Sequence, residues 1–354
     1  MKKYFIQFIL LKSLFILNIS FKCGINSIKR PKIQQISPVE EDSNNLKLRR
    51  ISPRNIQIYI DYEILENKVS KNIITQEFLY IIKSAFDYAN DIFKKILIVK
   101  NPNKFSISQN MIDEMDLDFS STEVPNLIKI SGSSEIDLYI VPYITDLSDG
   151  AIAAASPLYL DGKTKRPFLG AVMLNNYYNL KNTNIIRYLG MLFLHELSHI
   201  LAFNDHLFEY FQGIKYPITK AIINGVERTL LKTPKVLEYA RGHFGCPSLG
   251  GVELENQGGE GSAGSHWESR IMLGDYMISE DYSEQVISDI TLAVFEDSGW
   301  YSVNYYTGGL FKTGKAEGCD FLQTTCIDKN KNETRFPLDF MCYSFRRYMQ
   351  PWIS

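Results

Sequence analysis

The feature that most constrains how this chain folds is a polar group inside an apolar stretch, "LHELSHILAF" at residues 194–203. Its apolar residues recur as in a helix that is mostly buried. His195 and His199 stand four positions apart, so they lie on one face of such a helix, about one turn from each other. An unpaired buried polar group costs about 1–3 kcal/mol. These histidines and Glu196 are therefore expected to have a function that offsets the cost of burying them.

The histidine spacing indicates a metal site. Two imidazoles one turn apart can bind the same ion. Glu196, rotated by about 100° from His195, can bind a water on the metal instead of the metal itself. The alternative is a chance match on a core helix, which is rare in a chain with 5 histidines among 354 residues. Catalytic zinc takes three protein ligands and keeps a fourth position open, so a third ligand is expected elsewhere.

Four residues are candidates for that third ligand. Asp205 follows His199 by six positions, as in the compact zinc-protease pattern, and His206 comes directly after it. His243 lies in "ARGHFGC" and His266 lies in "AGSHWESRIMLGDYM". A long insertion can leave the helix and return to the metal, so the spacing leaves all four open.

Strands are expected before the histidine helix. "IQIYIDYEI" alternates like a strand, "ITQEFLYIIKSAFDYANDIFKKI" has helical spacing, and "LIVK" follows as a second strand. "EIDLYIVPYI" and "FLGAVMLNN" predict further strands, with turns between them. The histidine helix then runs from about Asn184 to Phe203. This order predicts an α+β domain with the helix packed on a sheet.

The amino terminus has the layout of a secretory signal, with two lysines followed by a broken apolar run in residues 1–24. An uncleaved membrane anchor is the alternative, and membrane association is expected only through this segment. Residues 25–50 are polar with little periodicity, which indicates a linker or short pro-segment. The mature chain is therefore expected to be secreted or to lie on the extracellular surface.

Composition limits the classes of partner that are expected. A net charge of −2 provides no general attraction to nucleic acid or to an anionic membrane, so no nucleic-acid partner is expected. Beyond Cys23, an even number of cysteines in a secreted chain makes disulfides plausible. They are Cys246, Cys319, Cys326 and Cys342. Their pairing and the oligomeric state cannot be read from the sequence.

Several motifs together resemble one protein family. "HELSHILAF", "ARGHFGC", "GSHWESRIMLGDYM" and "TLAVFEDSGWY" through "GCDF" follow each other in the order and spacing of leishmanolysin, a metzincin zinc protease. The resemblance implies one catalytic Zn²⁺ held by His195, His199 and His266, with Glu196 as catalytic base. It also implies that Met277 is the methionine of the turn beneath the metal.

The resemblance implies a domain plan as well. The fold expected is α+β and metzincin-like, with a mixed twisted sheet and an active-site helix above a mostly irregular and helical lower subdomain. Its parts are a catalytic subdomain at 51–203, an insertion at 204–265, and a carboxy-terminal part at 266–354 with the third ligand and the methionine turn. "FLGAVMLNN" is the candidate edge strand that pairs with extended substrate. Asp275 and Trp267 either orient the ligands or serve ordinary packing.

Some positions depart from the family pattern. Ala202 stands where metzincins usually carry glycine, which predicts either a left-handed alanine, at a cost of about 1 kcal/mol, or a straighter helix end. Leu158 stands where relatives commonly carry cysteine, so one family disulfide is expected to be absent. Upstream of the domain only Cys23 is left for a cysteine-switch latency mechanism, which is therefore not expected. The chain stops shortly after Cys342, so it is expected to be truncated relative to the family.

The function expected is a secreted zinc-dependent endopeptidase that acts on proteins or peptides. Neutral imidazoles leave the zinc its charge, so that a bound water has a pKa of about 7, and Glu196 removes its proton during attack on a peptide carbonyl. The alternative is a catalytically weak or inactive adhesion or binding protein on the same scaffold, suggested by Ala202, Leu158 and the early end of the chain.

Overall fold

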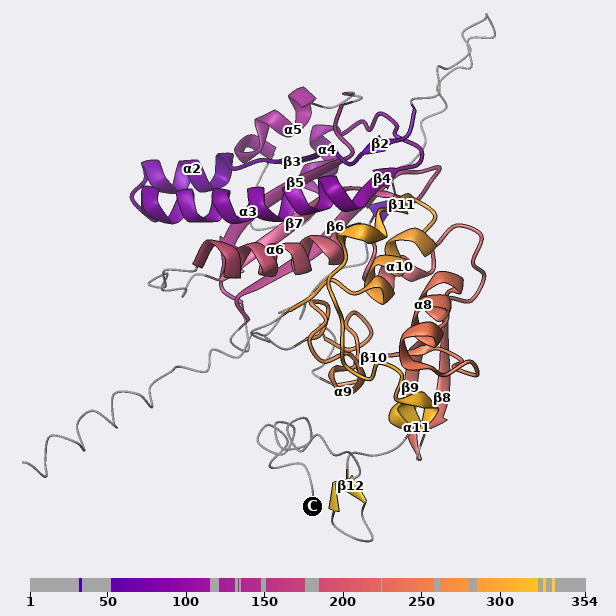
Figure 1. The fold of residues 1–354 in the computed structure, drawn as a ribbon. Helices are drawn as coiled ribbons and strands as arrows, with labels where there is room; N and C mark the ends of the chain where they lie inside the picture. The colour runs from indigo at the N-terminus through magenta and orange to yellow at the C-terminus, as the bar shows by residue number, and fades with distance from the viewer. Residues whose placement is uncertain are drawn as a thin grey trace, which may run out of the picture.

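A five-stranded mixed sheet with helices packed against it forms the first half of the described chain (Figure 1). The computed structural model describes residues 32–33, 52–114, 121–130, 133, 135–147, 151–175, 185–223, 225–257, 262–279, 285–323, 327–328 and 333–334. In this half the elements are β1 (Lys32–Ile33), β2 (Arg54–Asn55), β3 (Ile58–Ile60), α2 (Glu63–Ser70), α3 (Gln76–Ile96), β4 (Leu97–Val99), α4 (Gln109–Asp113), η1 (Ser121–Glu123), α5 (Pro125–Ile130), β5 (Leu138–Thr145), β6 (Ala153–Leu160), β7 (Pro167–Asn175) and α6 (Ile185–Leu201).

The sheet order is β1-β6-β7-β5-β3. β3 pairs in parallel with β5, and β5 pairs in parallel with β7. β6 runs antiparallel to β7, while the two-residue β1 pairs in parallel with the end of β6 at Tyr159 and Leu160. The α+β class and the mixed sheet predicted from the sequence are confirmed, as are α3, α6 and the strands β4, β5 and β7.

Two strand predictions need correction. The strand expected over "IQIYIDYEI" ends at Ile60, because the Asp61 carboxylate accepts a hydrogen bond from the Glu63 amide at 2.9 Å and starts α2 there. β6 was missed altogether, since its stretch was expected to hold only turns. Its residues are almost all buried on both faces, so the sequence lacks the alternation that marks a half-buried strand.

The prediction that "FLGAVMLNN" is an edge strand is wrong. These residues form β7, which lies between β5 and β6. β6 is the outermost long strand instead, and among the described residues only β1 pairs with its outer side. A strand's place in a sheet depends on long-range pairing, which the pattern within one strand does not reveal.

Helix α6 is enclosed between α3 and the sheet. The ring of Phe86 on α3 stacks on Phe193 of α6 with ring centroids 3.9 Å apart. On the sheet side, a Cβ added at Gly170 of β7 would lie 2.6 Å from the Ile200 side chain. Close packing on both sides explains why a helix this apolar forms.

Membrane insertion does not account for the apolar character of α6. Among the residues that the structure describes, Ile185–Phe208 alone is long and apolar enough to cross a membrane by length and composition. Of its most apolar window, 78% is buried inside the protein. The stretch is therefore the core helix of the domain.

Most of the second half of the described chain forms the lower part in Figure 1, while β11 lies beside β4. Its elements are α7 (Asp205–Phe208), β8 (Ile218–Ile223), β9 (Val226–Leu231), α8 (Pro234–Phe244), β10 (Val252–Leu254), α9 (Ser269–Met272), α10 (Asp289–Asp297), β11 (Tyr301–Val303), η3 (Tyr305–Thr307), α11 (Gly318–Gln323), β12 (Ile327–Asp328) and β13 (Glu333–Thr334). β11 pairs with β4 of the first half, so a late segment of the chain packs against an early one.

The lower part is less irregular than the sequence analysis predicted. It contains a three-stranded antiparallel sheet in the order β10-β9-β8. A signal for it exists in the sequence, because "ITKAII" and "VERTLL" flank Asn224-Gly225, and Asn-Gly is a strong hairpin signal. Gly225 has a φ of 78°, which glycine adopts at no steric cost.

One disulfide joins Cys246, just after α8, to Cys319 in α11. It confirms that this chain forms disulfides and connects two segments 73 residues apart. The other cysteines, the predicted signal at 1–24 and all of the predicted pro-segment except Lys32–Ile33 lie outside the described residues.

The contact between α3 and α6 can be tested at Gly190. A Cβ added there would lie 2.4 Å from the Tyr88 ring, whereas a Cβ added at Gly242 of α8 meets nothing within 4 Å. Gly190→Ala should therefore lower the free energy of unfolding by about 1–3 kcal/mol through overpacking. Gly242→Ala should leave it unchanged or raise it by up to about 1 kcal/mol through helix propensity. Urea denaturation of both variants measures this, and equal stabilities would contradict the close packing.

Candidate metal centre

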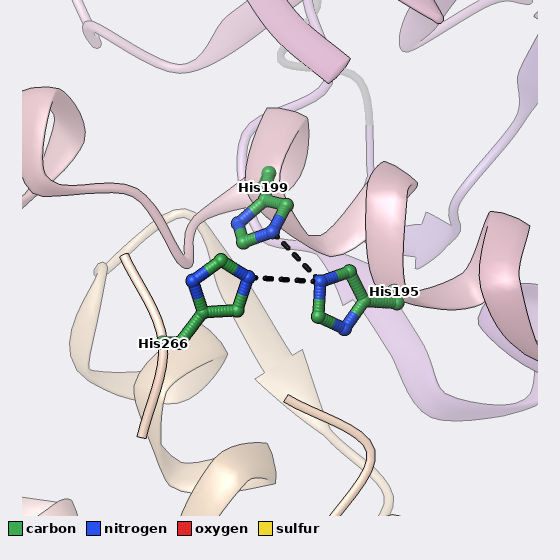
Figure 2. A group of neighbouring side chains, drawn as sticks. All are labelled: His195, His199 and His266. Carbon is green, nitrogen blue, oxygen red and sulfur yellow. Dashed lines mark hydrogen bonds between the residues drawn. The ribbon is translucent and has the colours of Figure 1, made fainter. Parts of the chain in front are cut away.

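Three imidazoles meet inside the protein (Figure 2). His195 and His199 come from α6, and His266 comes from the segment before α9. The Nε2 atoms of His195 and His266 are 3.1 Å apart, and those of His199 and His195 are 3.0 Å apart. The side chains are nearly or fully buried, with exposures of 3%, 0% and 0%. The third candidate ligand that joins the pair on the helix is thus His266.

Each imidazole is held by a backbone carbonyl on its far side. The Nδ1 atom of His195 lies 2.7 Å from the Tyr276 carbonyl oxygen, that of His199 lies 2.7 Å from the carbonyl of Phe203, and that of His266 lies 2.9 Å from the carbonyl of Ser262. A carbonyl only accepts hydrogen bonds. The proton of each neutral ring is therefore on Nδ1, and each Nε2 presents a lone pair.

Burial keeps these rings neutral. It lowers the pKa of His195 to about 4 and the pKa of His266 to about 3. Burial and the two neighbouring histidines also lower the pKa of His199. Neutral imidazole is the form that binds a metal ion.

The arrangement of the nitrogens fits a metal ion. With the protons on Nδ1, the short contacts between Nε2 atoms bring lone pairs together and cannot be hydrogen bonds. A cation between them removes this repulsion. Zinc at 2.0–2.1 Å from each nitrogen in tetrahedral geometry would place the nitrogens about 3.3 Å apart. The cluster therefore needs only a small outward shift to hold such an ion.

Glu196 lies beside the first of these histidines on α6 and is fully buried. Its neighbours on the helix are His195 and Leu197, so it leaves the helix in a different direction from the imidazoles. Glu196 is therefore a buried carboxylate directly next to a candidate ligand in the sequence.

The helix end that follows explains the alanine at position 202. Ala202 is buried and is not among the residues with positive φ in the described part of the chain. Instead, the amides of Ala202 and Phe203 both donate to the Ser198 carbonyl. The chain then places the Phe203 carbonyl against His199. Of the two predicted alternatives, the left-handed alanine is therefore not found, and α6 ends at Leu201.

A turn at residues 274–278 lies against the cluster. The Asp275 carboxylate, whose pKa burial raises to about 6, accepts hydrogen bonds from the Met277 amide and the Thr291 hydroxyl, both at 2.8 Å. The Trp267 indole donates to the same hydroxyl at 2.7 Å, and the Trp267 amide donates to the Met277 carbonyl at 3.0 Å. The turn that holds Met277 is thus bonded to the residue directly after His266.

The other candidate ligands lie outside the cluster. In the part of the chain that the structure describes, the group of side chains able to hold a metal consists of His195, His199 and His266. Asp205 begins α7, and its amide bonds to the Ser265 hydroxyl. His206 Nδ1 lies 3.5 Å from Asp205 Oδ1. His243 bonds through Nε2 to the Thr313 carbonyl at 2.8 Å, next to the disulfide.

Two residues of the site were not predicted from the sequence. Tyr276 contributes its carbonyl to His195 and its hydroxyl to Ser198. In the sequence, Ser198 is a polar residue on a helix predicted to be buried, and this could have identified it as part of the site. Tyr276 had no such signal, because every residue has a carbonyl and only the fold decides which one meets an imidazole.

The comparison with known proteins agrees with this geometry. A family described as leishmanolysin matches residues 67–352. The chain is 46% identical over 102 residues to a leishmanolysin-like peptidase of Drosophila pseudoobscura pseudoobscura, covering 29% of this chain and 15% of that protein. It is 36% identical over 143 residues to a leishmanolysin homolog of Crithidia fasciculata, covering 40% and 21%.

A longer alignment extends to leishmanolysin of Leishmania tropica. It has 28% identity over 236 residues and covers 64% of this chain and 33% of that protein. The matched segments thus span a third or less of the length of these relatives.

The third ligand can be tested by metal content. His266→Ala should abolish stoichiometric zinc retention, because it removes one of three ligands. Asp205→Ala and His206→Ala should retain zinc, since neither side chain joins the cluster. Dialysis followed by elemental analysis measures this. Zinc loss from either control, with His266→Ala unaffected, would contradict the assignment.

Acid should destabilise the metal-free protein. The pKa values of His195 and His266 are about 4 and about 3 in the folded chain, against about 6.5 in the unfolded chain. As the pH falls from about 6.5 to about 4, the unfolded chain binds protons that the folded cluster does not, so the free energy of unfolding decreases. Urea denaturation at a series of pH values measures the slope. A variant with all three histidines replaced by asparagine should lose much of this slope. An unchanged slope would mean that other groups cause the pH dependence.

Proposed function

Because this chain belongs to the leishmanolysin family, we propose that it is a zinc-dependent endopeptidase that hydrolyses peptide bonds of proteins. The observation that carries this proposal is the convergence of three neutral imidazoles beside a buried glutamate on α6. Three protein ligands with a free fourth position are typical of catalytic zinc rather than structural zinc.

The proposed roles follow from the chemistry of each side chain. His195, His199 and His266 would hold the ion through Nε2. When bound, zinc supplies a Lewis acid that polarises a substrate carbonyl and lowers the pKa of a water to about 7. Glu196 takes the proton from the attacking water and returns it to the leaving amine, so that one carboxylate acts first as base and then as acid. The turn that carries Met277 supports the cluster from below.

Substrate is proposed to bind along β6. An extended peptide can add to the outer side of an edge strand through backbone hydrogen bonds. β6 is the outermost long strand, and its outer side pairs only at Tyr159 and Leu160 among the described residues. A pocket of about 530 Å³, lined in part by Ala263 and Gly264, lies close in the chain to His266 in the lower part of the molecule.

A second candidate function is binding or adhesion without catalysis. One observation favours it: His195 is 3% exposed, while Glu196, His199 and His266 are 0% exposed. Water and substrate must reach these groups before any hydrolysis. The helix end at Ala202 no longer favours this alternative, because it is unstrained.

Processing and location are part of the proposal. Residues 1–24 act as a secretory signal and residues 25–50 as a linker or pro-segment, which leads to a secreted or surface-exposed protein. The catalytic subdomain spans 51–203, the insertion 204–265 and the carboxy-terminal part 266–354. The pair Cys246–Cys319 supports this route, since disulfides persist in oxidising compartments.

The base can be tested with Glu196→Ala. This variant should keep zinc and the fold while hydrolysis of casein falls by about 100-fold or more, because only proton transfer is removed. Glu238→Gln, on the exposed surface of α8, is the control and should retain wild-type activity. Near wild-type activity of Glu196→Ala would refute the mechanism. A wild-type protein that holds zinc but hydrolyses nothing, with or without chelator, would favour the binding function.

A further inference from the structure

Tyr276 contacts the histidine helix at two points. Its carbonyl oxygen lies 2.7 Å from His195 Nδ1, and its hydroxyl lies 2.9 Å from Ser198 Oγ. Positions 195 and 198 are three apart, so they are neighbours on the surface of α6. Tyr276 is 1% exposed and Ser198 is 0% exposed. One buried residue of the turn therefore holds a candidate ligand with its backbone and the helix with its side chain.

The direction of the hydroxyl contact follows from a third group. Ser198 Oγ lies 2.7 Å from the Leu194 carbonyl oxygen, which can only accept. The single proton of Ser198 is therefore donated to Leu194, and the Tyr276 hydroxyl must donate to Ser198. A short chain of hydrogen bonds runs from Tyr276 through Ser198 into the backbone of α6.

The turn is fixed from its other side as well. The Tyr276 amide donates to the Val286 carbonyl at 3.0 Å. Asp275 accepts hydrogen bonds from Met277 at 2.8 Å and from Ser288 at 3.3 Å. These contacts attach residues 275–277 to the segment that leads into α10. These hydrogen bonds and the Tyr276–Ser198 bond on the opposite side together fix where the Tyr276 carbonyl lies against His195.

We propose that the Tyr276–Ser198 hydrogen bond is a positioning device that holds His195 in the tautomer and ring orientation needed for metal binding. Neither residue is among the candidate ligands. Tyr276 positions His195 through its carbonyl, and Ser198 positions Tyr276. The inference rests on the proposed function only in taking the histidine cluster as the metal site.

Both variants that remove this hydrogen bond are expected to release His195. Ser198→Ala leaves the buried Tyr276 hydroxyl without its acceptor, so Tyr276 is no longer held against α6 and its carbonyl shifts away from His195. Tyr276→Phe removes the same hydrogen bond but leaves Ser198 bonded to Leu194, so its effect should be the smaller of the two. Ser198→Ala combined with Tyr276→Phe removes the same bond only once and should have no larger effect than Ser198→Ala alone.

The test measures zinc loss and the histidine tautomer. Groups that orient a metal ligand typically change metal affinity by about 10- to 100-fold, so Ser198→Ala should lose zinc to a chelator about tenfold faster or more. Tyr276→Phe should also lose zinc faster than wild type, by about threefold or more, and the double variant should lose it no faster than Ser198→Ala. In the metal-free protein, ¹⁵N spectra of labelled histidine should show the Nδ1 proton of His195 in wild type and a mixture of tautomers in Ser198→Ala.

Ser298→Ala is the matched control. Ser298 is fully buried and donates to the Phe295 carbonyl at 2.6 Å, so it has the same chemistry at the end of α10. It should lower the melting temperature without changing zinc loss or the His195 tautomer. A similar effect of Ser298→Ala on zinc loss would overturn the proposal, because the effect would then reflect stability alone.

Further outcomes decide the matter. Wild-type zinc loss and tautomer in Ser198→Ala would overturn the proposal. A double variant whose acceleration of zinc loss is the product of the two single effects would also overturn it, since the two hydroxyls would then act independently. If Ser198→Ala fails to fold, Tyr276→Phe decides: faster zinc loss with mixed His195 tautomers supports the proposal, and wild-type behaviour overturns it. The tautomer is read without metal or peptide, so a protein that hydrolyses nothing contradicts the proposed function and leaves this inference standing.

Discussion

The site depends on three hydrogen bonds from imidazole Nδ1 atoms to backbone carbonyls. They determine which nitrogen carries the proton, and so they direct three lone pairs to one point. The acceptors belong to three different pieces of chain: the end of α6 at Phe203, the loop at Ser262 and the turn at Tyr276. Every part of the fold that places one of these carbonyls therefore contributes to the candidate metal centre.

The chain of the lower part folds back against the upper part and so brings His266 to the histidine helix. His266 follows His199 by 67 positions (266 − 199), and the chain between them includes a three-stranded sheet and α8. The Cys246–Cys319 disulfide connects this insertion to α11, and β11 pairs with β4. These long-range connections hold the third imidazole at the helix, whose own residues supply only two.

The site is assembled but deeply buried. Glu196 and the three histidines have almost no exposed surface, and burial is also what keeps the imidazoles neutral by lowering their pKa values. The same environment therefore favours metal binding and restricts access. The outer side of β6, the edge at which extended substrate is proposed to add to the sheet, is the proposed link between fold and function.

The sequence alone determined the elements whose signal is local. The spacing of His195 and His199 within an apolar run predicts the helix and its two imidazoles, and helical periodicity predicts α3. Motif order also pointed to His266, where spacing left four candidates open. The tertiary structure decided what depends on distant segments: that β7 is internal and β6 lies at the edge, and that Tyr276 bonds to both His195 and Ser198. The physical reason is that periodicity reports which face of one element is buried, whereas strand order and the partner of a buried polar group are set by chain segments far apart in sequence.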